Sequence, residues 1–212
     1  MISDRLNCVF IHIPKCAGTS IESALWTPEE KTAENLFGGM LNKYQNPYQT
    51  GGMQHLKALQ VRHVVGRERF DSAFKFTIVR NPFARAVSQF QYIKGLRFLR
   101  KYIGLKSKDD FKTYLQKIHK RTHVQWEPQV SFVYDHQGRQ MVDYVGRFEE
   151  LQSSFQHICA ELNIQADLPH KKKSDQKSIP YQSYYDAESI AYIEDVFADD
   201  LEVFGYRFEP LS

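Results

Sequence analysis

Cysteine is scarce in this chain, with only Cys8, Cys16 and Cys159 among 212 residues. An odd count argues against a disulfide framework, and no two cysteines have the short spacing typical of a metal site. We therefore expect no bound metal and a reducing, cytoplasmic environment.

Long apolar runs are also missing, and charge of either sign is nearly balanced. The apolar run that follows residues 1–7 is interrupted by His12 and Pro14, so neither a secretory signal nor stable membrane insertion is expected. The 28 Lys and Arg residues exceed the 25 Asp and Glu residues by a net charge of +3. This small excess argues against nucleic-acid binding through a broad basic face, although it permits a local basic site for an anion. Length and composition, with 42% hydrophobic residues, fit a single domain over residues 1–212.

The first informative stretch covers residues 8–25, CVFIHIPKCAGTSIESAL. Its apolar residues from Cys8 to Ile13 predict a strand buried in a parallel sheet, which Pro14 ends. Small and hydroxyl residues then follow, namely Ala17, Gly18, Thr19 and Ser20. They leave room for backbone N–H groups to approach a ligand and can cap a following helix, while Lys15 adds a positive charge. The stretch predicts an anion-binding turn between a strand and a helix.

The spacing in this turn differs from the Walker A loop of ATP-binding proteins. Walker A places two glycines around four residues and a lysine just before Ser or Thr, whereas here the lysine precedes the turn as Lys15-x-x-x-Thr19. Taken alone, the stretch is also compatible with an ordinary strand-to-helix turn that carries a solvated lysine.

A second stretch, residues 74–92, reads FKFTIVRNPFARAVSQFQY. Its β-prone run Phe76–Val79 places Arg80 at a strand end, and Asn81-Pro82 opens a helix. Ser88 lies eight residues after Arg80, about two helical turns into that helix, and can face the carboxyl edge of the sheet where doubly wound folds bind ligands. A guanidinium and a hydroxyl together suit a phosphate dianion.

The two stretches resemble the sulfotransferases that use 3′-phosphoadenosine-5′-phosphosulfate (PAPS). Residues 8–25 resemble their phosphosulfate-binding loop, and residues 79–88 resemble the 3′-phosphate motif of the carbohydrate, heparan-sulfate-like branch. The resemblance implies an α/β fold of three layers with a central, mostly parallel sheet, similar to the P-loop nucleotide kinases. It also implies that PAPS is the sulfuryl donor and that adenosine 3′,5′-bisphosphate is the product. The PAPS-binding residues that it implies are Lys15, Cys16, Ala17, Gly18, Thr19, Ser20, Arg80 and Ser88. Animal members are usually anchored in the Golgi by an N-terminal membrane helix. Since this sequence shows no stretch of membrane-spanning length, we expect a soluble, cytoplasmic bacterial enzyme.

In the resembled family, a histidine about 25 residues before the Arg-Asn-Pro motif often acts as the general base. His55 precedes Arg80 by 25 residues. An imidazole titrates close to working pH and can take the proton of an acceptor hydroxyl. The resemblance thus implies catalytic roles for His55 and for Lys15, which would stabilise the bridging oxygen of the departing phosphate. His12 and His123 are alternative bases.

Other segments carry weaker predictions. The aromatic, glycine-rich segment 27–52 is interpreted as a covering loop beside the site, and residues 123–132, with Trp126, Glu127 and Gln129, as a candidate sugar contact. Lys171–Lys173 resemble a basic loop that folds over the nucleotide in related enzymes. Further elements are expected as a helix from residue 82, a helix from about residue 107, a strand over 141–145 and helices over 149–162 and 188–204.

The sequence predicts sulfuryl transfer from PAPS to a hydroxyl acceptor, taken to be a carbohydrate. Two alternatives stay open: a nucleotide kinase of similar fold, and a non-catalytic module that binds nucleotide without turnover. The acceptor's identity and the oligomeric state are not encoded in these patterns.

Overall fold

The computed structural model describes residues 1–38, 52–169 and 179–211. Within these residues lies a four-stranded sheet of order β1-β2-β3-β4. Its strands are β1 (Ile2–Ser3), β2 (Cys8–Ile11), β3 (Phe74–Val79) and β4 (Tyr144–Arg147). Strand β1 is antiparallel to β2, whereas β2, β3 and β4 run parallel. The carboxyl ends of the three parallel strands therefore meet at one edge of the sheet.

Apolar side chains explain why these strands are central. All four residues of β2 and the last four of β3 are buried. Phe10 and Phe76 occupy paired positions in the register, and their rings stack with centroids 5.1 Å apart. Burial on both faces is the usual condition of parallel strands, because helices cover both sides.

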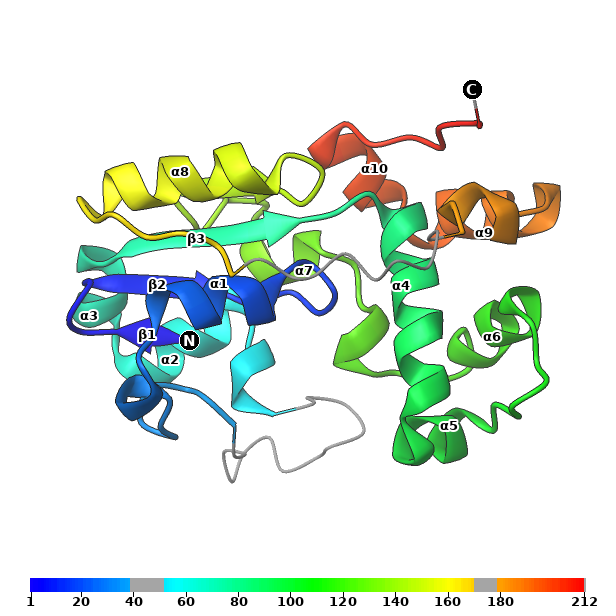
Figure 1. Cartoon of the computed structure of the whole chain (residues 1–212), viewed down its shortest axis with the longest axis horizontal. Helices are drawn as coiled ribbons and strands as arrows, with labels where there is room; N and C mark the ends of the chain where they lie inside the picture. Colours follow the sequence, from blue (N-terminus) through cyan, green and yellow to red (C-terminus); the bar gives the residue numbers. More distant parts are fainter. Residues whose placement is uncertain (39–51, 170–178, 212) are drawn as a thin grey trace.

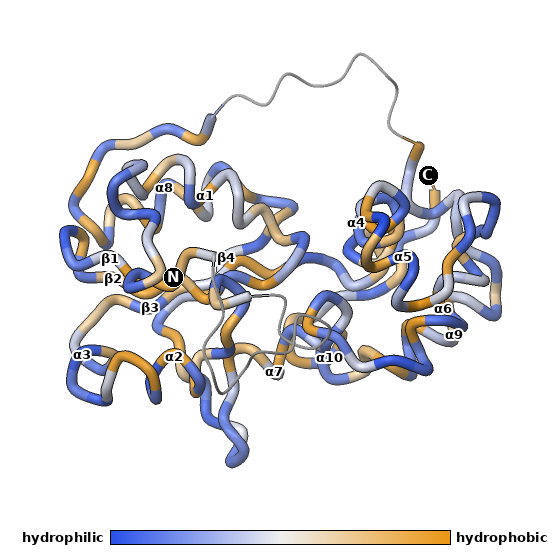
Figure 2. The backbone as a smooth tube through the Cα atoms, turned by 90° about the horizontal axis from the view of Figure 1, so that it is seen from below, coloured by the Kyte–Doolittle hydropathy of each residue, from blue (hydrophilic) through white to orange (hydrophobic). Residues whose placement is uncertain are grey.

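The sheet forms the middle of three layers (Figure 2). Helices α1 (Gly18–Leu25) and α8 (Leu151–Glu161) lie on one face. The other face is covered by α2 (Ala58–Val65), α3 (Arg67–Ser72) and the short α7 (Val130–Val133). This arrangement confirms the predicted α/β fold with a mostly parallel sheet.

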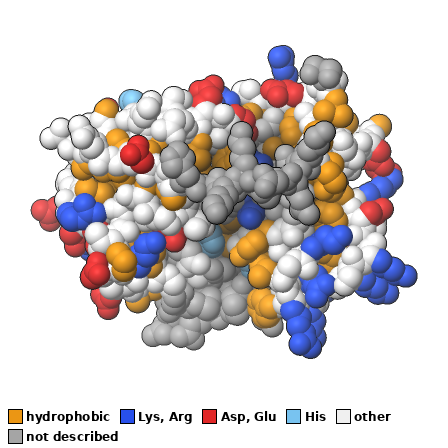
Figure 3. Space-filling view, viewed as in Figure 1, with side chains coloured by type: hydrophobic (Ala, Val, Ile, Leu, Met, Phe, Trp, Pro, Cys, Tyr) orange, Lys and Arg blue, Asp and Glu red, His pale blue; other side chains and the backbone are white. Residues whose placement is uncertain are grey.

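A helical part lies beyond the carboxyl ends of the strands, at the right of Figure 1. It contains α4 (Pro82–Gly95), α5 (Arg97–Ile103), α6 (Phe111–Ile118), α9 (Ala187–Val196) and α10 (Ala198–Phe204). Its core, built around Phe83, Phe90 and Tyr114, is separate from the core that surrounds the sheet. Lys and Arg side chains gather over α5 and α6 on the face shown in Figure 3. Arg97 and Lys101 of α5 are exposed.

Several boundaries differ from the sequence-based expectations. The helix expected from about residue 107 begins at Phe111 with Asp110 as its cap, and the strand expected over 141–145 lies at Tyr144–Arg147. The helix expected over 188–204 is broken at Phe197, whose φ and ψ of −116° and 27° are not helical. The break starts α10 and places Asp200 in its first turn, where it contacts the site described below. No described helix is long and apolar enough to cross a bilayer.

Candidate active site

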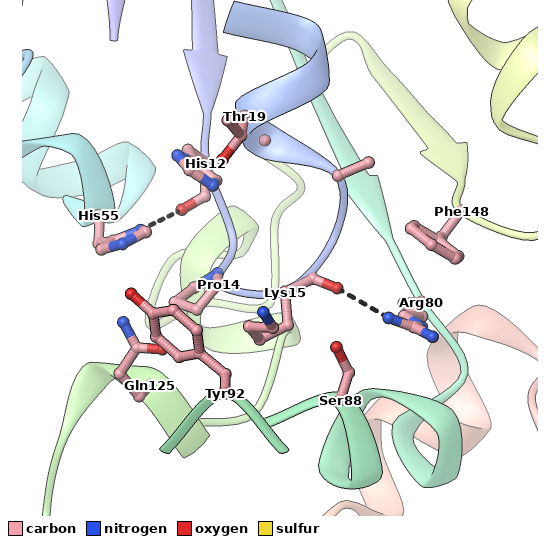
Figure 4. Close-up of a pocket in the computed structure, with 12 residues that line it drawn as sticks. His12, Pro14, Lys15, Thr19, His55, Arg80, Ser88, Tyr92, Gln125 and Phe148 are labelled. Atoms are coloured by element: carbon pink, nitrogen blue, oxygen red, sulfur yellow. Dashed lines mark hydrogen bonds between the residues drawn. The ribbon is translucent and has the colours of Figure 1, made fainter. Parts of the chain in front are cut away.

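A cavity of about 290 Å³ opens at the carboxyl ends of β2 and β3 (Figure 4). The loop after β2, the strand end of β3 and one face of α4 all contribute to it. The lining residues are His12, Pro14, Lys15, Ala17, Gly18, Thr19, His55, Arg80, Ser88, Tyr92, Gln125 and Phe148. The structure thus brings together both sequence stretches and His55, which is 43 residues from His12 along the chain.

The backbone of the loop between β2 and α1 is curled. Lys15 and Ala17 both have positive φ, at 68° and 62°. A left-handed backbone costs a non-glycine residue about 1 kcal/mol or more, so the surrounding contacts must hold it in place. Alternating backbone handedness of this kind turns successive N–H groups toward one concavity, beside the positive end of α1.

The capping of the N-terminus of α1 differs from the prediction. Helix α1 begins at Gly18 after Ala17, and no side chain caps it. Thr19 and Ser20 therefore lie inside the first turn and do not cap it. An uncapped N-terminus leaves its first N–H groups available to a ligand.

Two predicted cofactor ligands do not line the cavity. Cys16 is 1% exposed, and its Sγ lies 3.4 Å from Gln129 Oε1. Burial raises the pKa of the Cys16 thiol to about 12, which makes it a packed neutral group. Ser20 is buried as well, and its N–H donates to Ala17 O at 2.9 Å. The side chains of Cys16 and Ser20 therefore lie away from the cavity, and their cofactor-binding role stays a prediction.

Lys15 and Tyr92 meet on the helical side of the cavity. Lys15 Nζ lies 4.2 Å from the centroid of the Tyr92 ring, at a distance suited to a cation–π contact. Tyr92 belongs to α4 and is 42% exposed. The contact places the ammonium between the curled loop and α4 (Figure 4).

Arg80 faces the same cavity from the end of β3. Its guanidinium carbon lies 4.0 Å from the centroid of the Phe148 ring, and Nη1 donates to Lys15 O at 3.3 Å. Its Nε is buried without a hydrogen-bond partner among the described residues. Burial lowers the pKa of Arg80 from its usual value, and the side chain remains a cation. An unpaired donor on a buried cation suits an anionic ligand.

Gln129 holds the peptide of Arg80 in position. Its Oε1 accepts from Arg80 N and its Nε2 donates to Arg80 O, both at 2.8 Å. Asp200 in turn accepts from Gln129 N at 2.8 Å and from Val130 N at 2.9 Å. Gln129 and Asp200 are fully buried. Gln129 therefore cannot contact a sugar, and this corrects that expectation.

Arg85 is a second supporting residue that sequence reasoning missed. It is 3% exposed and donates to the carbonyl oxygens of Pro14 at 3.1 Å, Glu127 at 2.8 Å and Gln125 at 3.4 Å. It thus joins the curled loop to residues 125–127. The sequence does carry a signal for it, because Arg85 is a charged residue on the buried face of α4.

His55 is buried beside the end of β2. Its Nδ1 lies 3.0 Å from His12 O. A carbonyl oxygen only accepts, so Nδ1 carries the proton and Nε2 carries a lone pair. Burial, as the largest cause, lowers the pKa of His55 from 6.5 to about 4. The sequence-based expectation of titration near working pH is therefore wrong for this fold, in which the imidazole is neutral and able to accept a proton.

Comparison with known proteins assigns the family. The model of the sulfotransferase family matches residues 1–207. The chain belongs to the sulfotransferase family. It is also similar to the crystal structure of a sulfotransferase from Alicyclobacillus acidocaldarius, with 17% identity, a TM-score of 0.48, and coverage of 95% of this chain and 96% of that chain. No curated protein matches it.

In this sulfotransferase, the segment after α6 contributes less to the cavity than predicted. Trp126 stacks on His123 with ring centroids 5.0 Å apart, and Glu127 forms a salt bridge with Lys57. Neither lines the cavity, whereas Gln125 does. His123 accepts from Gln125 N through Nδ1. Lys171–Lys173 and much of the expected covering loop lie outside the described residues.

A second cavity, of about 610 Å³, adjoins the first in the sulfotransferase. Arg80 and Phe148 line both cavities. Aromatic rings from Tyr181 and Tyr206 also face it, and Tyr206 donates to Glu149 Oε2 at 2.9 Å. Arg80 and Phe148 are therefore positioned to contact a ligand in either cavity.

Proposed function

We propose that this sulfotransferase transfers a sulfuryl group from PAPS to a hydroxyl group, with a carbohydrate as the acceptor. The observation that carries the proposal is that Lys15, Arg80 and His55 line one cavity, with Nδ1 of His55 held by His12 O. Two cations suit a highly anionic donor, and a neutral imidazole suits an acceptor proton.

The curled loop and the Arg80 end of the cavity fit the two anionic ends of PAPS. Backbone N–H groups of Ala17, Gly18 and Thr19 lie at the uncapped start of α1 and suit the 5′-phosphosulfate. Arg80, with its unpaired Nε, and Ser88 suit the 3′-phosphate. The adjoining cavity leaves room for the nucleoside.

When bound, PAPS supplies an activated sulfuryl group. The bond from sulfur to the bridging phosphate oxygen breaks, and a bond from sulfur to the acceptor oxygen forms. His55 Nε2 takes the acceptor's hydroxyl proton, while Lys15 Nζ offsets the negative charge that develops on the bridging oxygen. The carbohydrate assignment rests on the likeness of residues 79–88 to the carbohydrate branch, and the polar Gln125 and aromatic Tyr92 of the cavity suit a sugar.

The test is transfer of labelled sulfate from PAPS to a panel of carbohydrate, phenol and peptide hydroxyls, read by mass spectrometry. Calorimetry with adenosine 3′,5′-bisphosphate is run beside it. Binding without transfer to any acceptor would favour the non-catalytic module, and magnesium-dependent ATP turnover would favour a kinase. The buried, unpaired cysteines are consistent with a cytoplasmic location, which stays a prediction.

A further inference from the structure

The ring of His12 occupies the space beside Gly18. A β-carbon added to Gly18 would lie 1.7 Å from His12 Nε2 and 2.0 Å from His12 Cδ2. These separations are far shorter than any van der Waals contact, so residue 18 is glycine because the imidazole lies against it. His12 Nε2 therefore lies against the first residue of α1, where the first turn has uncapped N–H groups.

The two ring nitrogens of His12 have different surroundings. Nδ1 is buried and has no hydrogen-bond partner among the described residues. The ring stacks on Phe10 with centroids 5.5 Å apart and planes at 10°, and it lies 4.6 Å from the ring of His55. Burial, followed by the nearby His55, keeps the pKa of His12 well below 6.5, so the ring is neutral.

A neutral imidazole has one N–H group and one lone pair. In proteins, a buried N–H group without an acceptor is rarer than an acceptor that lacks a donor. The proton is thus placed on Nε2, which leaves the lone pair at the orphaned Nδ1. The donor then faces the curled loop and the start of α1.

We propose that His12 is a ligand-contacting residue of this site and donates its Nε2–H to an anionic oxygen held at the start of α1. Under the proposed function, on which the identity of the anion rests, that oxygen belongs to the phosphosulfate. His12 would then serve both reactants, because its carbonyl oxygen orients His55 while its ring binds the donor. A neutral N–H group donates along one fixed direction, which complements the positive charge of Lys15. It also keeps its proton at neutral pH.

The proton position is tested without any ligand. Nitrogen-15 NMR of the imidazoles in the free protein should show His12 as the Nε2–H tautomer and His55 as the Nδ1–H tautomer. Spectra of His12→Gln and His55→Asn assign the signals. An Nδ1–H tautomer at His12 would overturn the proposal, whatever the protein binds.

The contact is tested with two variants of different chemistry. In His12→Gln the side-chain Nε2 can replace the imidazole donor, whereas His12→Leu keeps apolar volume and removes it. Calorimetry with adenosine 3′,5′-bisphosphate should find affinity about 10- to 100-fold weaker for the leucine variant and close to the parent for the glutamine variant. His63→Leu, at an exposed histidine of α2, is the matched control. Melting temperatures establish that each variant is folded.

Parental affinity in a folded leucine variant would overturn the inference. If the parent itself fails to bind the nucleotide, the proposed function fails, and the variant pair is compared with pyrophosphate as the probe. Equal pyrophosphate affinities in both variants would then overturn the His12 contact.

The steric relation with Gly18 gives a second test. Gly18→Ala should lower the melting temperature and nucleotide affinity of the parent, because the new methyl group displaces the ring. In a His12→Ala background, the same substitution should have a much smaller effect. An equal loss of melting temperature and affinity in both backgrounds would contradict the packing of the His12 ring against Gly18.

Discussion

Replacing His55 by asparagine separates its proposed chemistry from its structural contact. The Asn Nδ2 group lies near the position of His Nδ1, so the hydrogen bond to His12 O can persist while the Nε2 lone pair is lost. Loss of a general base typically lowers the rate about 100- to 10,000-fold. We expect that fall in single-turnover sulfuryl transfer, with nearly unchanged affinity for adenosine 3′,5′-bisphosphate.

The same substitution should change how stability depends on pH. His55 has a pKa of about 4 in the fold and 6.5 when unfolded, so the unfolded chain binds its proton first on acidification. The stability that the neutral ring contributes is present above pH 6.5 and is lost as the pH falls toward 4. The full difference amounts to about 3 kcal/mol, of which about 2 kcal/mol is lost by pH 5.

Urea unfolding at pH 7 and pH 5 measures this difference. The parent should lose about 2 kcal/mol more than His55→Asn between the two pH values, whereas His63→Asn, at an exposed histidine, should behave like the parent. Parental turnover in His55→Asn would move the base elsewhere. An acid dependence identical to that of the parent would show that His55 is not a buried neutral group.

Four further substitutions test other parts of the site. Arg80→Ala and Ser88→Ala should each weaken binding of adenosine 3′,5′-bisphosphate about tenfold or more in calorimetry and reduce the preference over the nucleotide that lacks the 3′-phosphate; an unchanged Kd would remove that assignment. Lys15→Ala should lower single-turnover transfer much more than nucleotide affinity, and the reverse pattern would make Lys15 a binding residue only. Asp200→Ala should destabilise the protein by about 3 kcal/mol or more in urea unfolding, because Gln129 N and Val130 N lose a buried acceptor. Its exposed neighbour provides the control Asp199→Ala, and equal effects of the two would contradict the supporting role of Asp200.

Local sequence patterns determined much of this protein's architecture. The apolar runs ending near Ile13 and at Val79 predicted two buried parallel strands, and Asn81-Pro82 predicted the start of α4. Strand ends of a parallel sheet meet at one edge, which is why the sequence alone places Lys15, Arg80 and Ser88 around one cavity. Their roles toward PAPS stay predictions, as does the single domain over residues 1–212.

Only the tertiary structure decided which groups hold those residues in place. Asp200 reaches Gln129 across 71 residues of chain, and Arg85 reaches Pro14 across the same separation. The tautomer of His55 and the packing of His12 on Gly18 likewise depend on burial and on contacts between distant segments. Strand and helix patterns reflect neighbours within a few residues along the chain. They carry no information about which buried donor will meet which distant acceptor, because that pairing is set by how the layers pack.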